Sequence, residues 1–336
     1  MEPHIPSVMK AIRYNRPADF ELVDMPVPIP EPHEVLIKDG EFPAHMPVVT
    51  GHETSGEVVN IGHAVSGFQI GDRVTADSTQ ECGACRACQS GQILYCRDLQ
   101  GRGTQLDGGF AEYCTFPASK LFHLTKLSWK DASLAEATAC AIHGMDRIRP
   151  VMGVGSTVLQ LGAGPTGLCL SQLLKLSGAV HVVLAAHEGP KMDLARALNV
   201  ADEYIDISRT DPDHSWHQLA WLHPGGFDVV VEATGDVRIL RRAIGFCAKG
   251  GTAVLYGVYP PDEEVVLTPS AIFLKELTII SSFSEMYCLP RAVRYLESGK
   301  VDVTGIVTHT FPLEKFGEAL QVIRDKKCVK ATIMME

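Results

Sequence analysis

The sequence predicts an α/β protein that combines a β-rich domain with a parallel, doubly wound sheet. The first observation is a set of short alternating apolar runs, split by glycine and proline turns, before residue 150. The second is a change near residue 150, after which short apolar strands alternate with helical patterns of about 10–15 residues. The third is a glycine-rich turn that joins the first of these strands to a helix.

In the β-rich part, residues 34–38 and 55–60 form short strand patterns, and residues 71–74 begin another strand. In the second part, four short apolar runs are typical of buried parallel strands. These runs lie at 157–161, 181–185, 227–231 and 252–256. Helical patterns at 166–176 and 190–198 follow the first two runs. The alternation of strand and helix predicts the doubly wound sheet.

The last 50 residues do not continue this alternation. We therefore predict one domain built from both chain ends, residues 1–150 and 286–336, around an inserted dinucleotide-binding domain at 151–285. A chain of 336 residues is long enough for two domains with their own cores.

The composition narrows the classes of partner. A net charge of −10 argues against nucleic acid or an anionic membrane as the main partner. We expect a small-molecule substrate. No run of 18 or more apolar residues occurs, and residues 1–10 lack the pattern of a signal peptide. Ten cysteines without a secretory signal favour a reducing compartment, and we expect a cytoplasmic protein.

Four cysteines predict a metal site. Cys82, Cys85, Cys88 and Cys96 follow the pattern Cys-x2-Cys-x2-Cys-x7-Cys, which can place four thiolates around one tetrahedral zinc ion. The alternative is four unrelated thiols, but such spacing inside a glycine-rich run seldom arises by chance. We expect a zinc-bound lobe over residues 80–98, and the spacing does not say what the metal does.

The glycine-rich turn predicts a dinucleotide site. It runs through Gly162, Gly164, Pro165, Thr166 and Gly167, directly after a predicted strand and at the start of a helix. In this context the glycines allow a tight turn and a close approach to a pyrophosphate, and the helix N-terminus favours its charge. The alternative is a glycine-rich turn that binds nothing.

Cofactor choice depends on the end of the second strand of this domain, where an acidic residue would bind the adenosine 2′-hydroxyl. The chain has Ala186 there, with His187 beside it and Lys191 nearby. We therefore favour NADP over NAD. Glu188 weakens this preference because it could reach the ribose. A third possibility is that cofactor binding has been lost.

Two pairs of residues are catalytic candidates. His52 and Glu53 are both zinc-ligand types, but adjacent residues on a strand face opposite ways unless the backbone bends. Glu136 and His143 lie two turns apart in a predicted helix over 131–144, among apolar neighbours. A buried imidazole there could act as a general acid or base. The alternatives are an ordinary polar pair for the first and an exposed Glu with a core His for the second.

Ser128 and Asp131 are the candidates for capping this helix.

Together these motifs resemble the zinc-containing medium-chain alcohol and polyol dehydrogenases, most closely the fungal D-arabinitol and sorbitol-type enzymes. The resemblance covers nearly the whole chain, including residues 71–74 and 108–113. It implies a GroES-like catalytic domain, a Rossmann domain and a homodimer or homotetramer. It also implies that the cysteine quartet binds structural zinc, that His52 and Glu53 match catalytic-zinc residues, and that Glu136 binds or neighbours that zinc.

The chain departs from this pattern after the strand at 34–38. Family members have a segment of about a dozen residues there, with a cysteine that binds the catalytic zinc, whereas here Lys38 is followed directly by Asp39. Cys114 and Cys140 are at positions that the family does not use. Three explanations remain open: the segment is missing from the sequence, the deletion leaves a weakened metal site, or the catalytic zinc is lost and the chemistry has changed.

The leading hypothesis is reversible oxidation of a secondary alcohol or polyol, with zinc as Lewis acid and NAD(P) as hydride acceptor. The alternative is a redox-neutral enzyme, a double-bond isomerase or dehydratase, that uses His143 for proton transfer. A third class is an inactive relative that serves as a binding or scaffold protein.

Overall fold

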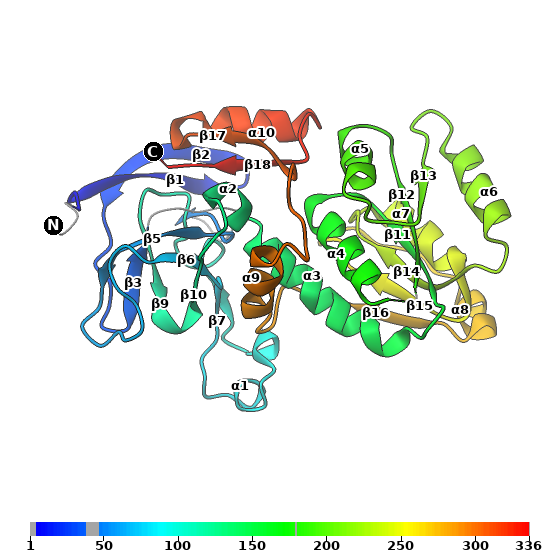
Figure 1. Ribbon diagram of the computed structural model, residues 1–336, viewed down its shortest axis with the longest axis horizontal. Helices are drawn as coiled ribbons and strands as arrows, with labels where there is room; N and C mark the ends of the chain where they lie inside the picture. The colour runs from blue at the N-terminus through cyan, green and yellow to red at the C-terminus, as the bar shows by residue number, and fades with distance from the viewer. Residues whose placement is uncertain (1–4, 38–46, 179, 336) are drawn as a thin grey trace. The chain divides into compact units, whose positions relative to one another are not determined.

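The computed structural model describes residues 5–37, 47–178 and 180–335, and it divides the chain into two compact units (Figure 1). The first unit comprises Met1–Ala139 and Met286–Glu336, and the second is Cys140–Glu285. The N-terminal segment of the first unit ends at Ala139, within the helix α3 (Ala135–Ile148). The boundary predicted from the sequence, at residue 150, lies after this helix. The predicted pairing of an α/β sheet domain with a β-rich domain is confirmed.

The described residues of the first unit form four small sheets. The strands before α3 are β1 (Val8–Arg16), β2 (Asp19–Pro26), β3 (Glu34–Ile37), β4 (Val48–Val49), β5 (Ser55–Ile61), β6 (Arg73–Ala76), β7 (Thr79–Gln80), β8 (Gln100–Gly101), β9 (Cys114–Pro117) and β10 (Leu121–His123). They form the sheets β2-β1-β4, β10-β6-β5-β3-β9 and β7-β8, and every pair in them is antiparallel. Near the C-terminus, β17 (Val307–Phe311) and β18 (Lys330–Ile333) pair in parallel.

The helices of this unit are short. They are α1 (Arg86–Gln89), α2 (Trp129–Ala132), α9 (Leu289–Glu297) and α10 (Phe316–Arg324), together with the first part of α3. The helix predicted over 131–144 is in fact interrupted, because α2 ends where the Ser133 hydroxyl donates to the carbonyl of Lys130 at 2.8 Å. The Ser128 hydroxyl caps α2 by accepting from the Asp131 N–H at 3.1 Å.

Both chain ends share one core. Phe316 of α10 packs edge-to-face on Phe110, with ring centroids 4.6 Å apart, and on Phe20 at 5.0 Å. Ile12 of β1 and Ile333 of β18 belong to the same buried cluster. Figure 1 shows α10 alongside β17 and β18. The C-terminal residues therefore complete the first unit, and they do not extend the sheet of the second.

The second unit is a six-stranded parallel sheet in the order β13-β12-β11-β14-β15-β16. Its strands are β11 (Thr157–Leu161), β12 (His181–Ala186), β13 (Glu203–Asp206), β14 (Phe227–Glu232), β15 (Cys247–Leu255) and β16 (Thr278–Ser281). Its helices are α4 (Pro165–Leu176), α5 (Pro190–Ala197), α6 (Pro212–Leu222), α7 (Val237–Ala243) and α8 (Pro269–Lys275). This strand order is that of dinucleotide-binding folds, which bind their ligand at the carboxyl ends of the strands.

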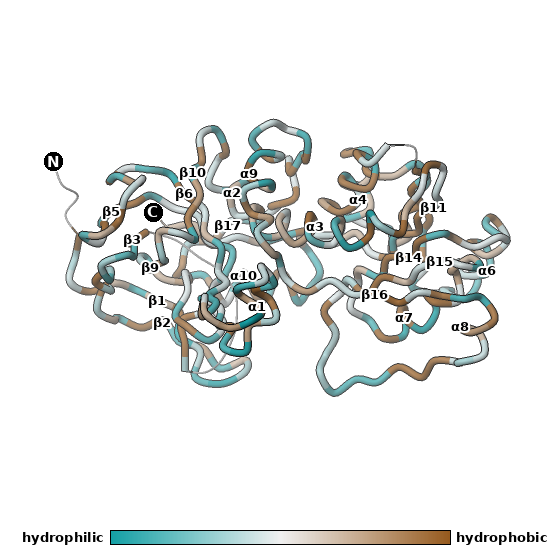
Figure 2. Tube along the Cα trace, turned by 90° about the horizontal axis from the view of Figure 1, so that it is seen from below, coloured by the Kyte–Doolittle hydropathy of each residue, from teal (hydrophilic) through white to brown (hydrophobic). Residues whose placement is uncertain are grey.

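The central strands of this sheet have continuous apolar stretches, as expected for strands covered on both faces. Val229, Val230 and Val231 are all at most 1% exposed. Figure 2 shows hydrophobic residues along β11 and β14. No helix in the described part of the chain is both long and apolar enough to cross a membrane.

Candidate functional site

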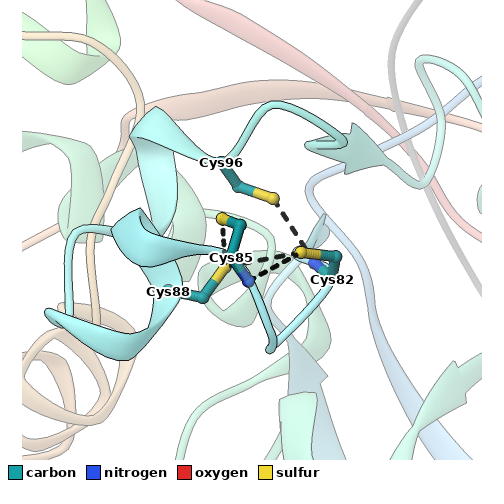
Figure 3. A group of neighbouring side chains, drawn as sticks. All are labelled: Cys82, Cys85, Cys88 and Cys96. Carbon is teal, nitrogen blue, oxygen red and sulfur yellow. Dashed lines mark hydrogen bonds between the residues drawn. The ribbon is translucent and has the colours of Figure 1, made fainter.

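The four predicted zinc ligands come together in one lobe. Cys82 follows β7, Cys85 and Cys88 flank the start of α1, and Cys96 precedes β8. Their sulfur atoms all lie within 4.8 Å of one another, with 3.5 Å between Cys85 and Cys88 and 4.0 Å between Cys82 and Cys88. Figure 3 shows the four side chains pointing toward a common centre. Four sulfurs this close fit the tetrahedral coordination of zinc.

The thiols of this lobe differ in acidity. Hydrogen bonds with the backbone and the thiol of Cys88, and with the other two thiols, lower the pKa of Cys85 to about 6. Desolvation, together with hydrogen bonds to the other thiols, raises the pKa of Cys88 to about 12. The contacts within the quartet thus favour the thiolate form at Cys85, which is the form that binds a cation.

A buried lysine anchors this lobe to the β-rich sheet. Lys120 Nζ lies 3.0 Å from a carboxylate oxygen of Asp77 and 2.7 Å from one of Glu81, the residue before Cys82. Although desolvation opposes its charge, the two carboxylates raise the pKa of Lys120 above its usual value. Lys120 thus compensates two acidic side chains at the base of the lobe.

His52 and Glu53 lie in the connection between β4 and β5, where the backbone bends at Glu53. The glycines of the 103–109 segment hold this connection in place. Gly109 N–H donates to the Gly51 carbonyl at 3.1 Å, and a Cβ on Gly103 or Gly108 would lie 2.2 Å from the same carbonyl oxygen. Only glycine permits this approach, which fixes the start of the His52 segment.

His52 and Glu53 each lie close to a charged side chain from another element of the fold. His52 Nε2 lies 4.0 Å from a carboxylate oxygen of Glu136, and Lys330 of β18 forms an ion pair with Glu53. The Glu136, Glu53 and Lys330 side chains are only 10–11% exposed. In the described part of the chain, His52, Glu53 and Glu136 do not form a group of three mutually close ligand atoms, whereas the cysteines do.

Sequence reasoning missed Lys330 because no motif marks it. It is one lysine in a basic C-terminal stretch, and only the fold brings it to Glu53.

Glu136 and His143 both lie on α3, as predicted. His143 is 8% exposed, which agrees with the expected burial of that face. Glu136 falls in the first unit and His143 in the second. The departure from the family pattern, where relatives carry a cysteine-bearing segment, falls at residues 38–46, which lie outside the described residues.

The glycine-rich turn has the geometry expected of a dinucleotide site. Gly162 follows β11 with φ of 104°, which favours glycine, and Gly164 and Pro165 begin α4. A Cβ on Gly167 would lie 3.0 Å from the Gly162 carbonyl oxygen, so this glycine lets helix and turn pack closely. The Gln160 side chain, fully buried, donates to the Gly162 and Gly167 carbonyls at 3.1 and 2.9 Å. Thr166 is in the first turn of α4.

The residues predicted to select the cofactor lie at the end of β12. Ala186 is the last residue of the strand, His187 Nδ1 contacts the Ile207 carbonyl, and Lys191 is exposed in the first turn of α5. The carboxylate of Glu188 is held by both terminal nitrogens of Arg196, one at 2.8 Å. That pairing lowers the pKa of Glu188 and turns its carboxylate toward α5.

Comparison with known proteins matches both units. Residues 31–126 match the family model described as alcohol dehydrogenase GroES-like domain, and residues 165–298 match the one described as zinc-binding dehydrogenase. The chain is 44% identical to D-arabinitol dehydrogenase 1 of Uromyces fabae, over 98% of each chain. It is 30% identical to a sorbitol dehydrogenase of Halalkalibacterium halodurans, over 94% of this chain and 95% of the relative.

Solved structures agree with these matches. A protein of Sinorhizobium meliloti 1021, assigned as a zinc-binding dehydrogenase and bound to NADP, superposes with a TM-score of 0.86 at 31% identity. The match covers 98% of this chain and 100% of that one. An alcohol dehydrogenase of Escherichia coli CFT073 in complex with NADH has the same TM-score at 25% identity, over 98% and 99% of the two chains.

These findings confirm the predicted fold class, an enzyme of the dehydrogenase type, and zinc and a nicotinamide dinucleotide as the cofactors of the family. They do not favour the redox-neutral alternative. The chain belongs to the zinc-containing medium-chain alcohol and polyol dehydrogenases, which are NAD(P)-dependent oxidoreductases.

Proposed function

We propose that this protein oxidises a secondary hydroxyl of an acyclic polyol to a ketone and passes the hydride to NADP or NAD. The observation that carries the proposal is the pair formed by His52 and Glu136, in a chain 44% identical to a D-arabinitol dehydrogenase. These two zinc-ligand types lie 4.0 Å apart, and their side chains are 27% and 11% exposed. Bound zinc would supply Lewis-acid polarisation of the hydroxyl.

We assign the two roles to the two units. The unit formed from both chain ends would hold the metals, and the inserted unit would bind the dinucleotide, in line with the domains predicted at 1–150 with 286–336 and at 151–285. The cysteine quartet would hold a structural zinc, because all four ligand positions are filled by protein thiols.

Within the catalytic metal site, His52 and Glu136 are the proposed ligands. Their donor atoms are 4.0 Å apart, and an ion bound by both needs each about 2.0–2.2 Å away. Glu53 is proposed as a nearby carboxylate that Lys330 holds in place, since its charge is already compensated. His143 remains a candidate proton acceptor, on the ground of its burial and its place on the same helix as Glu136.

The family resemblance implies a cysteine as a further ligand of the catalytic zinc, and we assign no residue of this chain to that position. The alignment with the Uromyces fabae enzyme is 343 residues long, whereas the chain has 336, so the relative carries residues that this chain lacks. Metal analysis combined with intact mass tests the proposal. Two zinc ions per chain would support a complete catalytic site, and one would restrict metal binding to the cysteine lobe.

The activity itself is tested with NADP and NAD against a panel that includes D-arabinitol and sorbitol, using zinc-loaded protein. We expect reduction of one dinucleotide, and its loss in His52→Ala. His63→Ala is the matched control, because His63 is an exposed histidine of the same unit. Absence of dinucleotide reduction by the zinc-loaded wild-type protein with every polyol would refute the proposal.

We further propose a homodimer or homotetramer that forms through the free edge of the second unit's sheet. The edge meant is β16, one of the two edge strands, on which Ile279 is 40% exposed. Phe273 and Leu274 of α8, the helix before β16 in the chain, are 79% and 72% exposed. Figure 2 shows α8 as a hydrophobic segment. Sedimentation analysis of wild type and Ile279→Lys would test it, with dissociation of the variant as the expected result.

We also propose a reducing compartment such as the cytoplasm, which fits a chain that carries ten cysteines, four of them in a metal-type cluster.

A further inference from the structure

A buried carboxylate, Glu232, lies at the carboxyl end of β14 and is 1% exposed. It is paired with Leu161 of β11, the residue before the Gly162 turn, and with Leu255 at the end of β15. It therefore stands at the edge of the sheet where this fold binds dinucleotides, between two strands that both end there.

Four donors surround this carboxylate. Oε1 accepts from the Thr234 N–H at 2.7 Å and from the Thr234 hydroxyl. Oε2 accepts from the Gly235 N–H at 3.1 Å and from the Tyr259 hydroxyl. Burial and the adjacent Glu232 carboxylate raise the pKa of Tyr259 above its usual value, so the phenol remains a donor at neutral pH. Each oxygen of this buried carboxyl group therefore accepts two hydrogen bonds.

These bonds join two loops, 233–236 after β14 and 256–259 after β15. The Glu232 carbonyl also accepts from the N–H groups of Tyr256 and Gly257, at 2.9 and 2.8 Å. A Cβ on Gly257 would lie 2.2 Å from the Gly235 nitrogen, and one on Gly235 would lie 2.2 Å from the Val258 carbonyl oxygen. The two loops therefore pack backbone against backbone around the Glu232 side chain.

The first loop also touches the dinucleotide turn. A Cβ on Gly162 would lie 2.8 Å from the Thr234 methyl carbon, and the Ala233 N–H donates to the Leu161 carbonyl at 2.9 Å. Thr234, held by Glu232, thus forms one wall of the Gly162 turn. A shift of the 233–236 loop would therefore change the space beside the Gly162 turn, where a pyrophosphate would bind.

We propose that Glu232, with Tyr259 as its phenol donor, is a positioning residue for the dinucleotide, which sets the 233–236 and 256–259 loops against the Gly162 turn. This role rests on the dinucleotide binding proposed for the second unit. It predicts that Glu232 controls cofactor affinity through the placement of Thr234 and Gly235, although the carboxylate itself need not touch the cofactor.

The test compares Glu232→Gln, Tyr259→Phe and the double variant by titration with NADPH and NADH, followed by nucleotide fluorescence. Glu232→Gln places an amide N–H₂ opposite the Gly235 N–H and the Tyr259 hydroxyl, so we expect the dissociation constant to rise about tenfold. Tyr259→Phe removes one donor and should have a smaller effect. The double variant should be no weaker than Glu232→Gln, because both changes disrupt the same contact.

Asp228→Asn is the matched control. Asp228 lies at the opposite end of β14, where its carboxylate accepts from the Thr157 N–H at 2.7 Å and from the Thr157 hydroxyl at 3.0 Å. This variant also loses a carboxylate that binds backbone, but at the sheet edge away from the glycine turn, so cofactor affinity should stay unchanged. If Glu232 had a purely structural role, Glu232→Gln and Asp228→Asn would both lower thermal stability, and their affinities for the dinucleotide would not differ.

In turnover assays the KM for the cofactor should rise more than kcat falls. The proposal is overturned if folded Glu232→Gln and Tyr259→Phe proteins both bind the dinucleotide within twofold of wild type. If Glu232→Gln does not fold, the Tyr259→Phe result decides. Failure of the wild-type protein to bind either dinucleotide would overturn the proposed function together with this role, whereas unchanged variants of a binding-competent protein overturn this role alone.

Discussion

Lys330 and Glu53 form an ion pair between residues 277 positions apart in the chain. The two side chains are 11% and 10% exposed, so both charges have lost most of their water. Glu53 adjoins His52, and Lys330 belongs to β18 near the C-terminus. The C-terminal segment therefore contributes a charge to the proposed metal site as well as apolar residues to the core.

Replacing Lys330 by methionine should destabilise the first unit and weaken the metal site. Removal of one partner of a buried ion pair leaves the other charge uncompensated, at a cost of about 3–5 kcal/mol. Urea unfolding at pH 7 measures that cost, and Lys330→Arg should recover most of it. The double change Glu53→Gln with Lys330→Met should be more stable than Lys330→Met alone; equal stability would show that the pair contributes no coupling.

Features encoded by short motifs were predictable from the sequence. The cysteine quartet spans fifteen residues and the glycine turn only six, so spacing alone brings their members together. Lys330 and Glu232 act through contacts between segments that periodicity does not connect, and no local pattern distinguishes them from other charged residues. The parallel, doubly wound sheet was predictable from the alternation of strands and helices, whereas its strand order is known only from the structure. The break between α2 and α3, near Ser133, was not predicted.

The residues expected to select the cofactor were predictable only in part, for a different reason. Glu188 was expected to compete for the ribose, because it lies two residues after Ala186. In the structure Arg196, in the last turn of α5, binds that carboxylate. The sequence contains both residues, but an exposed pair eight positions apart follows no helix or strand spacing that would indicate it.

Loss of one cysteine ligand should remove one zinc ion per chain. In Cys96→Ser we expect the 80–98 lobe to lose its metal and the protein to become less heat-stable, because structural zinc contributes directly to folding. Cys169→Ala, a buried cysteine of α4, is the control and should keep its zinc. Zinc content by atomic emission and thermal unfolding give the readouts. Unchanged zinc content in Cys96→Ser would show that the quartet is not the metal site.

Zinc binding to this lobe should depend on pH in a defined way. Hydrogen bonds within the quartet lower the pKa of Cys85, desolvation raises the pKa of Cys88, and zinc binds cysteine as thiolate. We therefore expect proton release when zinc binds at pH 7, and weaker binding as the pH falls, because protons then compete with zinc for the four sulfur atoms. Calorimetry in buffers of different ionisation enthalpy measures the released protons.

Glu297 of α9 makes the first unit sensitive to acid. Its carboxylate accepts from the N–H groups of Thr125 and Lys126 at 2.7 and 2.9 Å. Although desolvation opposes ionisation, hydrogen bonds from Thr125 and the backbone lower the pKa of Glu297. Because the folded pKa is below the unfolded value, this stabilisation is complete above the unfolded pKa and is lost as the pH falls through the folded one.

Glu297→Gln should therefore lower the free energy of unfolding by about 1 kcal/mol at pH 7, where the carboxylate is ionised and partly exposed. The difference from wild type should shrink as the pH is lowered below about 4, the usual range of a free glutamate. Urea unfolding at several pH values measures it. The exposed Glu318→Gln in α10 is the control, and a difference that stays constant with pH would contradict this assignment.

Ala186→Asp should lower the affinity of the dinucleotide site for NADP. An aspartate at the end of β12 would repel a 2′-phosphate and could bind a 2′-hydroxyl. We expect the dissociation constant for NADPH to rise about tenfold or more, and that for NADH to fall or stay the same. Ala186→Asn has the same shape without the charge and should retain NADPH, which separates repulsion from crowding. If wild type and Ala186→Asp bind NADPH equally well, the 2′-phosphate does not lie next to residue 186. The preference for NADP inferred from Ala186, His187 and Lys191 would then be wrong.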